Sequence, residues 1–277
     1  AFLACGLITA THFNGAIIVL SGDGYAAGYQ SLARSVALSA VILVAGFADG
    51  GMRVGVSLFS LALIFMIGAR SEFAAFALAF CIYELFRNIA RLRSWLWLTA
   101  LSLTALACLY VWWDRILDFV EGSRQLLLFS LEGSTSWEAR QEMSTFAWDT
   151  IRNHPIAGDF GSHFNFPREE GEMGGTYAHS IISAWVSFGI VGFALYAITN
   201  IAALALAVRR MFDRTPSAQW RAAFYMTASS TILLLAAKPV FWPIPAFGWG
   251  LVVAAQYADN RRRRVNPQLR KQPIVQI

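Results

Sequence analysis

Long apolar runs, separated by short polar connections, dominate the pattern of this 277-residue chain. A transmembrane helix needs ~20 predominantly apolar residues to cross a bilayer. Measured against that length, the pattern predicts about eight membrane spans. They lie near residues 1–20, 34–48, 53–69, 72–86, 95–113, 179–208, 222–237 and 240–258. The expected fold is therefore an all-α, polytopic integral membrane protein.

Composition supports this class. The chain is 57% hydrophobic and 14% charged, with a mean hydropathy of +0.51, whereas roughly a quarter of the residues in a soluble domain are charged. Cys5, Cys81 and Cys108 each stand alone in an apolar run, so they indicate neither a metal site nor a disulfide framework. Because the chain starts in apolar sequence without the pattern of a signal peptide, we expect it to be the C-terminal part of a longer protein.

The connection formed by residues 114–178 differs from all others in its charge. It holds 11 of the 17 acidic residues but only 5 of the 22 basic ones. Arginines concentrate instead in connections on the opposite face and in the tail, where Arg261–Arg264 follow one another. By the positive-inside rule that face and both chain ends are cytoplasmic, and 114–178 is periplasmic. The arginine run indicates an orientation signal with affinity for anionic lipid and gives no reason to expect nucleic acid as a partner.

These features predict four segments. A first group of transmembrane helices covers 1–113, a periplasmic catalytic loop covers 114–178, a second helix group covers 179–258, and a basic cytoplasmic tail covers 259–277. Within the loop, apolar residues at helical spacing predict an amphipathic helix. Thr135 and Glu138 fit a capping box at its start, and Pro155 ends it.

Three basic residues are candidates for binding an anionic substrate on the outer face. Arg70 lies between two apolar runs in "MIGARSEFAAF", where a functional role and a snorkelling or Glu72-paired arginine are both open. Arg140 lies in the first turn of the amphipathic helix and is either a ligand for substrate or a solvated surface charge. Lys238, in "AAKPVFWPIP", adds a third positive group at another outer turn.

His179 stands where the span 179–208 begins. The dipole at a helix start disfavours a positive imidazole, and a neutral imidazole is able to accept a proton. At the outer membrane edge it is suited to act as a general base on a sugar hydroxyl, the alternative being an interfacial residue that caps its helix. A zinc site of His154, His163 and His179 is disfavoured, because the chain lacks HExxH and the spacings fit no common ligand pattern.

The segments "GARSEF", "SWEARQEMSTFAWDTIRNHPIAGDFG" and "YAHSIISAWVSFGIVGF" occur in this order. Together they resemble the C-terminal half of the O-antigen ligase and O-antigen polymerase superfamily, over roughly residues 55–210. The resemblance implies a bacterial inner-membrane glycosyltransferase that needs no metal or other cofactor. It further implies that Arg70 and Arg140 bind the diphosphate of an undecaprenyl-linked glycan, while His179 activates the acceptor hydroxyl.

The acceptor stays open. A ligase transfers a finished glycan to a lipid core or a protein, whereas a polymerase transfers a growing chain to another lipid-linked repeat, and both use the same donor chemistry. A transporter or flippase for such lipids is a further alternative of a different class. It favours inverted repeats with broken helices, and the sequence contains no detectable internal repeat. Membrane lipids are expected partners in every case.

Overall fold

The computed structural model describes residues 9–13, 17–20, 29–48, 50–67, 69–88, 135–162, 180–213, 216–238 and 240–265. The chain divides into two compact units. The first comprises Ala1–Val44 and Asp49–Ser134, and the second comprises Ala45–Ala48 and Thr135–Ile277.

The first unit contains two strands and three helices among its described residues. They are β1 (Thr9–Phe13), β2 (Ile17–Leu20), α1 (Tyr29–Gly46, whose last two residues belong to the second unit), α2 (Gly50–Ile67) and α3 (Arg70–Asn88). The three helices lie where spans 34–48, 53–69 and 72–86 were predicted. The predicted span 95–113 lies outside the described residues.

The predicted helical span over residues 1–20 is wrong where the structure describes it. β1 and β2 pair antiparallel there, with Thr9 opposite Leu20 and Phe13 opposite Ile17, and the register shifts between Ala10 and Phe13. β-Branched residues are frequent in both strands, and Asn14-Gly15 separates them in sequence. This combination favours a hairpin over a helix, a local preference that the hydropathy of the segment conceals.

A buried ion pair joins α2 and α3. Arg53 Nε donates to Glu84 Oε1 at 2.6 Å and Arg53 Nη2 donates to Glu84 Oε2 at 3.1 Å. The guanidinium also lies 4.9 Å from the ring centroid of Tyr83. Both charged side chains are buried, so each depends on the other for compensation of its lost hydration. Neither residue was predicted to have a role, although each is a charge within an apolar run.

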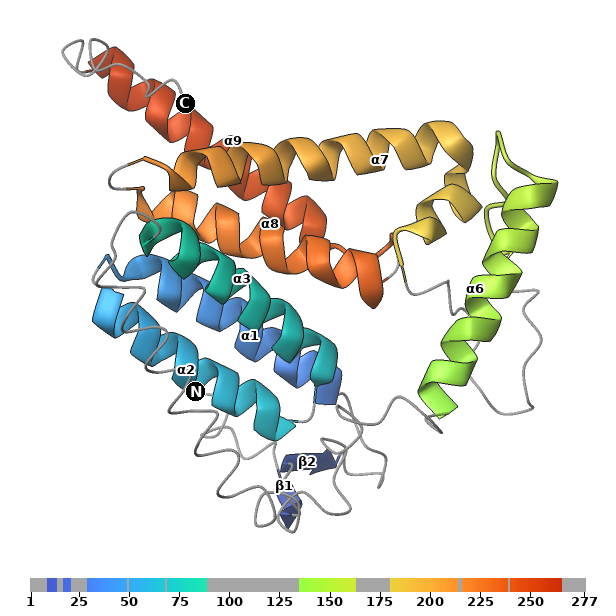
Figure 1. Cartoon of the computed structure of the whole chain (residues 1–277), viewed down its shortest axis with the longest axis horizontal. Coiled ribbons are helices and arrows are strands. Elements are labelled where there is room, and N and C mark those ends of the chain that lie inside the picture. The colour runs from blue at the N-terminus through green and yellow to red at the C-terminus, as the bar shows by residue number, and fades with distance from the viewer. Residues whose placement is uncertain are drawn as a thin grey trace. The chain divides into compact units, whose positions relative to one another are not determined.

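The second unit is built from four described helices. They are α6 (Thr135–Asn153), α7 (Ile182–Met211), α8 (Ala218–Ala236) and α9 (Ile244–Val265). Helices α7, α8 and α9 pack on one another, and α6 packs on the first part of α7 (Figure 1). α6 occupies the place of the predicted amphipathic helix, which confirms that helix, and α7 to α9 lie where the last three spans were predicted.

Helix α8 forms the centre of this unit. Its residues 223–228 are all buried, and a helix that is apolar on all sides is suited to such a position. Ser217 caps its start by accepting a hydrogen bond from the Trp220 N–H. Near that start Arg221 donates to the carbonyls of Ala45 and Gly46. These are carbonyls at the end of α1, where a positive charge also complements the helix dipole.

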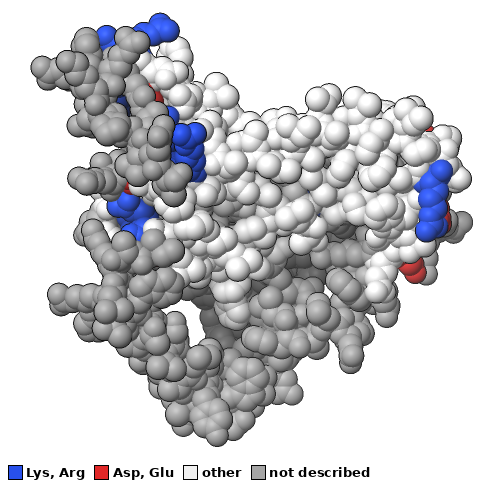
Figure 2. Space-filling view, turned by 45° about the horizontal axis from the view of Figure 1, so that its top comes forward, with Lys and Arg blue, Asp and Glu red and all other residues white. Residues whose placement is uncertain are grey.

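Helix α7 presents apolar side chains outward. Val191, Leu195, Ile198 and Ile201 are each more than 60% exposed, and in water such a surface is unfavourable. Among the described helices, α7 is the one whose length and apolar composition suffice to cross a membrane. Figure 2 shows a broad uncharged surface between two groups of charged side chains. This is the pattern of a helix surrounded by lipid; that the remaining helices cross the bilayer stays a prediction.

Candidate functional site

The four residues predicted for the site fall in both units. Arg70 is the first residue of α3, Arg140 lies in α6, and Lys238 follows the end of α8. His179 lies outside the described residues, directly before Ser180, and the side chains of Arg70 and Arg140 lie outside them as well. Lys238 is 6% exposed. Of the predicted site, the structure therefore describes the turn between α8 and α9 that carries Lys238, and the start of α7, which follows His179 in sequence.

Helix α7 breaks at Gly189. This residue has φ 67° and ψ −172°, a conformation that is essentially restricted to glycine. In a continuous helix the Ile190 N–H would donate to the Val186 carbonyl, four residues earlier. The break separates these two groups, and α7 bends visibly near its start (Figure 1). Buried main-chain groups separated in this way need other partners.

The segment Pro155–Asp159, which we call the docked loop, supplies those partners. The Ile190 N–H donates to the Pro155 carbonyl at 3.1 Å, and the Asp159 N–H donates to the Val186 carbonyl at 2.7 Å. The Trp185 Nε1–H donates to the same Pro155 carbonyl at 2.9 Å. The docked loop thus takes both hydrogen bonds of the missing helical step. The end of α6 is thereby held against the start of α7.

Two glycines make this contact possible. Gly158, at φ 72°, lies so close to α7 that an added Cβ would be 2.4 Å from the Gly189 nitrogen. A Cβ on Gly189 would lie 1.8 Å from the carbonyl oxygen of Ile156. Neither distance is compatible with non-bonded atoms. The two main chains touch only because both residues lack a side chain.

The turn that carries Lys238 is bonded to the first turn of α7. The Ser183 hydroxyl donates to the Ser180 carbonyl at 2.7 Å, and its oxygen accepts the Val240 N–H at 2.8 Å. Ser183 is fully buried. One hydroxyl therefore connects the residue that follows His179 in sequence to the turn between α8 and α9. The structure brings the Lys238 turn beside the chain neighbours of His179, although the two are distant in sequence.

Helix α6 packs on the same part of α7 through its apolar side. Ala147 and Ile151 form a buried cluster with Val186, and Ile182 and Trp185 pack against it. The Trp185 ring stacks on that of Phe193, at 5.4 Å between centroids. These contacts use the residue spacing from which the amphipathic helix was predicted. They set the orientation of α6 relative to the start of α7.

Three phenylalanines join the same segments at the surface. Phe160 follows the docked loop, and Phe188 precedes the break in α7. Phe241 lies three residues after Lys238, in the turn between α8 and α9. Their ring centroids are 5.6 to 6.0 Å apart. All three are exposed, and exposed apolar groups of this kind are typical of contact with lipid or ligand.

Among the described residues there is no group of three or more histidines, cysteines, aspartates or glutamates able to hold a metal ion. His163 and His179 are not among those residues.

The sequence predicted the candidate cations and His179 as site residues. It did not predict the contacts that join the docked loop and the Lys238 turn to the start of α7. Ser183 was not a candidate, and Gly158 and Gly189 occur within the segments that carry the family resemblance but had no role assigned. A signal was present, because a glycine within a long apolar run often marks a break or a close approach. Its partner segment is distant in sequence, since Pro155 and Ile190 are 35 residues apart, and no local pattern indicates it.

Comparison with known proteins adds one finding. A family model described as O-antigen ligase matches residues 55–197, more than half of the chain. The matched range includes Arg70, Arg140 and the position of His179, together with the docked loop and the break in α7. Neither the curated proteins nor the solved structures contain a match to the chain.

Proposed function

The chain belongs to the O-antigen ligase family, and from this premise we propose that it transfers a glycan from undecaprenyl diphosphate to an acceptor hydroxyl. The reaction is assigned to the periplasmic face of the bacterial inner membrane. The observation that carries the proposal is the junction at the start of α7. There the docked loop and the Lys238 turn are both hydrogen-bonded to the helix that begins beside His179.

In the proposed step, the acceptor hydroxyl gives its proton to His179 while its oxygen attacks the anomeric carbon of the donor sugar. The new carbon–oxygen bond forms as the bond from that carbon to the phosphate oxygen breaks, with inversion. The bonding electrons leave with the lipid diphosphate. Proton acceptance needs a neutral imidazole, which a position at a helix start favours.

The leaving diphosphate needs compensation for its negative charge. We assign this role to Arg70 and Arg140, because guanidinium groups contact phosphate oxygens through two parallel hydrogen bonds. Lys238 is the third candidate. Its support is the hydroxyl of Ser183, which joins its turn to the start of α7. The positive end of the α7 dipole acts in the same direction.

The acceptor separates a ligase from a polymerase. We propose the ligase reaction, in which a finished glycan passes to a lipid core, and keep the polymerase reaction as the alternative with the same donor. Deletion of the gene distinguishes them. Loss of a ligase leaves full-length glycan on the lipid carrier, whereas loss of a polymerase leaves single repeat units on it.

The experiment that tests the proposal replaces His179 with glutamine in the full chain and measures transfer from a purified lipid-linked donor. Loss of a general base costs ~10²–10⁴-fold in rate, so transfer by His179→Gln is expected to fall by about that factor. Donor affinity is expected to stay unchanged, because donor binding is assigned to the arginines. His154→Gln is the matched control, since His154 is exposed just after α6 and has no assigned role.

Glutamine retains a polar side chain that is able to cap a helix. Substantial transfer by His179→Gln would therefore reduce His179 to an interfacial cap and refute the proposed step. An equal loss in His154→Gln would point to damage of the loop rather than to the chemistry.

A further inference from the structure

Exposed arginines gather where α7 and α9 end. Arg209 lies in the last turn of α7, and Arg261, Arg262 and Arg264 lie in the last turns of α9. All four are exposed, and we call them the arginine surface. Figure 2 shows Lys and Arg side chains collected at this end of the two helices, beyond the uncharged surface.

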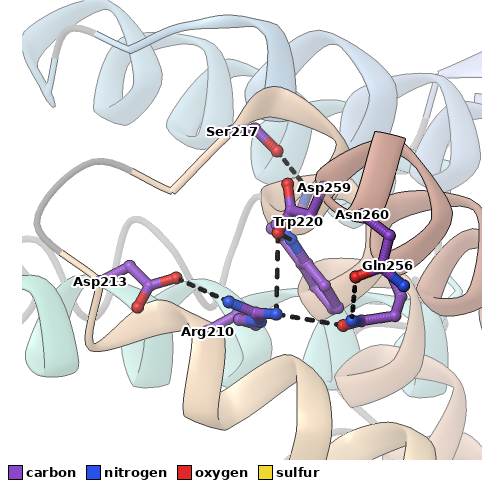
Figure 3. Close-up of polar contacts among 7 residues, drawn as sticks. All are labelled: Arg210, Asp213, Ser217, Trp220, Gln256, Asp259 and Asn260. Carbon is purple, nitrogen blue, oxygen red and sulfur yellow. Dashed lines mark hydrogen bonds and ion pairs between the residues drawn. The ribbon is translucent and has the colours of Figure 1, made fainter. Parts of the chain in front are cut away.

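A polar cluster holds the two helix ends together (Figure 3). The Arg210 guanidinium donates to Gln256 at 3.1 Å, lies 3.7 Å from a carboxylate oxygen of Asp259, and covers the ring of Trp220 at 5.1 Å. Trp220 in turn donates to Asp259 at 2.8 Å. Arg210 also pairs with Asp213, at 3.6 Å. Arg210 thus contacts both nearby acids, while the arginine surface faces outward on a fixed base.

The outward face of α9 changes in chemistry along its length. Val253 and Tyr257 are 67% and 69% exposed, and Arg261 and Arg264 continue the same side of the helix, within about 80° of Val253 at 100° per residue. The order is apolar, then aromatic with a polar tip, then basic. This is the order of hydrocarbon, interface and headgroup in one leaflet of a bilayer.

Helix α7 repeats this arrangement. Ile198 and Ile201 are exposed, and Arg209 follows them on the same side. Eight residues separate Val253 from Arg261 in α9, a rise of about 12 Å, comparable with the ~15 Å that half of the hydrocarbon core measures. With Val253 in hydrocarbon, Arg261 and Arg264 reach the level of the lipid phosphates.

We infer that the arginine surface binds the phosphate headgroups of anionic membrane lipids. The fixed helix ends present the guanidinium groups together, and guanidinium groups bind phosphate through paired hydrogen bonds. The exposed apolar and aromatic side chains beneath contact the acyl chains of the same lipids. This binding is independent of glycan transfer, because none of the four arginines belongs to the proposed site.

The test titrates the purified full chain in detergent with three probes: dioctanoyl phosphatidylglycerol, dioctanoyl phosphatidylcholine and inorganic phosphate. Phosphatidylglycerol is expected to bind more tightly than either of the others, and more weakly as salt is raised. Each arginine near an anionic surface contributes roughly five-fold in affinity. The triple variant Arg209→Gln, Arg261→Gln and Arg264→Gln is therefore expected to lose at least ~10-fold in phosphatidylglycerol affinity.

The matched control is Arg152→Gln, because Arg152 is an exposed arginine at the end of α6, outside the arginine surface. It is expected to bind phosphatidylglycerol like the parent chain. Where the triple variant does not remain folded, Arg264→Gln alone is expected to lose about five-fold. Equal binding of the two lipids, parent-like affinity of the variants, or an equal loss in the control would each overturn the inference. Phosphate binding as tight as that of phosphatidylglycerol would overturn the assignment to lipid.

Discussion

Replacing Gly189 with alanine is expected to separate the docked loop from α7. A Cβ at this position would lie 1.8 Å from the carbonyl oxygen of Ile156, while real Cβ contacts essentially never fall below 3.0 Å. The two segments must therefore move apart by at least 1.2 Å, the difference between these distances. Such a movement breaks the main-chain bonds from Ile190 to Pro155 and from Asp159 to Val186.

The cost has two parts. Alanine in the backbone conformation of Gly189 carries about 1–3 kcal/mol of strain. Two hydrogen bonds at about 0.5–1.5 kcal/mol each add about 1–3 kcal/mol. The docked state is therefore expected to lose about 2–6 kcal/mol relative to a state in which the loop has separated. Even the lower value corresponds to on the order of 30-fold more frequent opening.

Hydrogen exchange measures this opening directly. In Gly189→Ala, peptides covering Asp159 and Ile190 are expected to exchange on the order of 30-fold faster than in the parent chain, while α8 keeps its protection. Glycan transfer is expected to fall as well, because the start of α7 loses its support beside His179. Gly250→Ala is the control, since Gly250 lies within α9 with nothing within 4 Å of an added Cβ. Parent-like protection at both amides in Gly189→Ala would refute the reasoning.

Three further outcomes are expected. Glu84→Gln removes the carboxylate from the buried Arg53–Glu84 pair and is expected to cost about 3–5 kcal/mol. The expected observation is a lower thermal midpoint in detergent, and an unchanged midpoint would contradict it. Ser183→Ala leaves the Val240 N–H without its acceptor, which is expected to cost about 1–3 kcal/mol of stability. Glycan transfer is expected to fall while membrane insertion of the chain stays normal. Normal transfer would show that this contact does not support the site. The topology is tested in a chain whose native cysteines have been replaced. Ser130→Cys is expected to react with a membrane-impermeant thiol reagent in intact cells, whereas Val265→Cys is expected not to react. Labelling at position 265 instead would reverse the assigned topology.

The contact between α7 and the docked loop lies within the part of the chain that matches the family model. Pro155, Gly158 and Gly189 all lie within the matched range. Pro155 ends α6 and offers its carbonyl, and the two glycines allow the main chains to touch. The geometry of this contact accounts for the two glycines, because a side chain at either position would collide with the other main chain. Motifs that look separate in sequence are therefore two sides of a single junction.

The helical character of most of the described chain and the positions of α6 and α7 were predictable from the sequence, because each depends on neighbours within a few turns. Apolar periodicity selects a helix and its buried side, as Ala147 and Ile151 illustrate in α6. The same reasoning failed at residues 9–13 and 17–20, where hydropathy measures burial in lipid but not the choice between strand and helix.

Only the tertiary structure decided which distant groups meet. The pairing of Arg53 with Glu84, the bond from Val240 to Ser183, and the contact of Gly158 with Gly189 each join segments about 30 or more residues apart. A buried polar group must find a partner, so the sequence by itself determined that such groups need compensation. It did not determine which partner, because that choice depends on how helices pack in three dimensions, where many pairings satisfy the same local pattern.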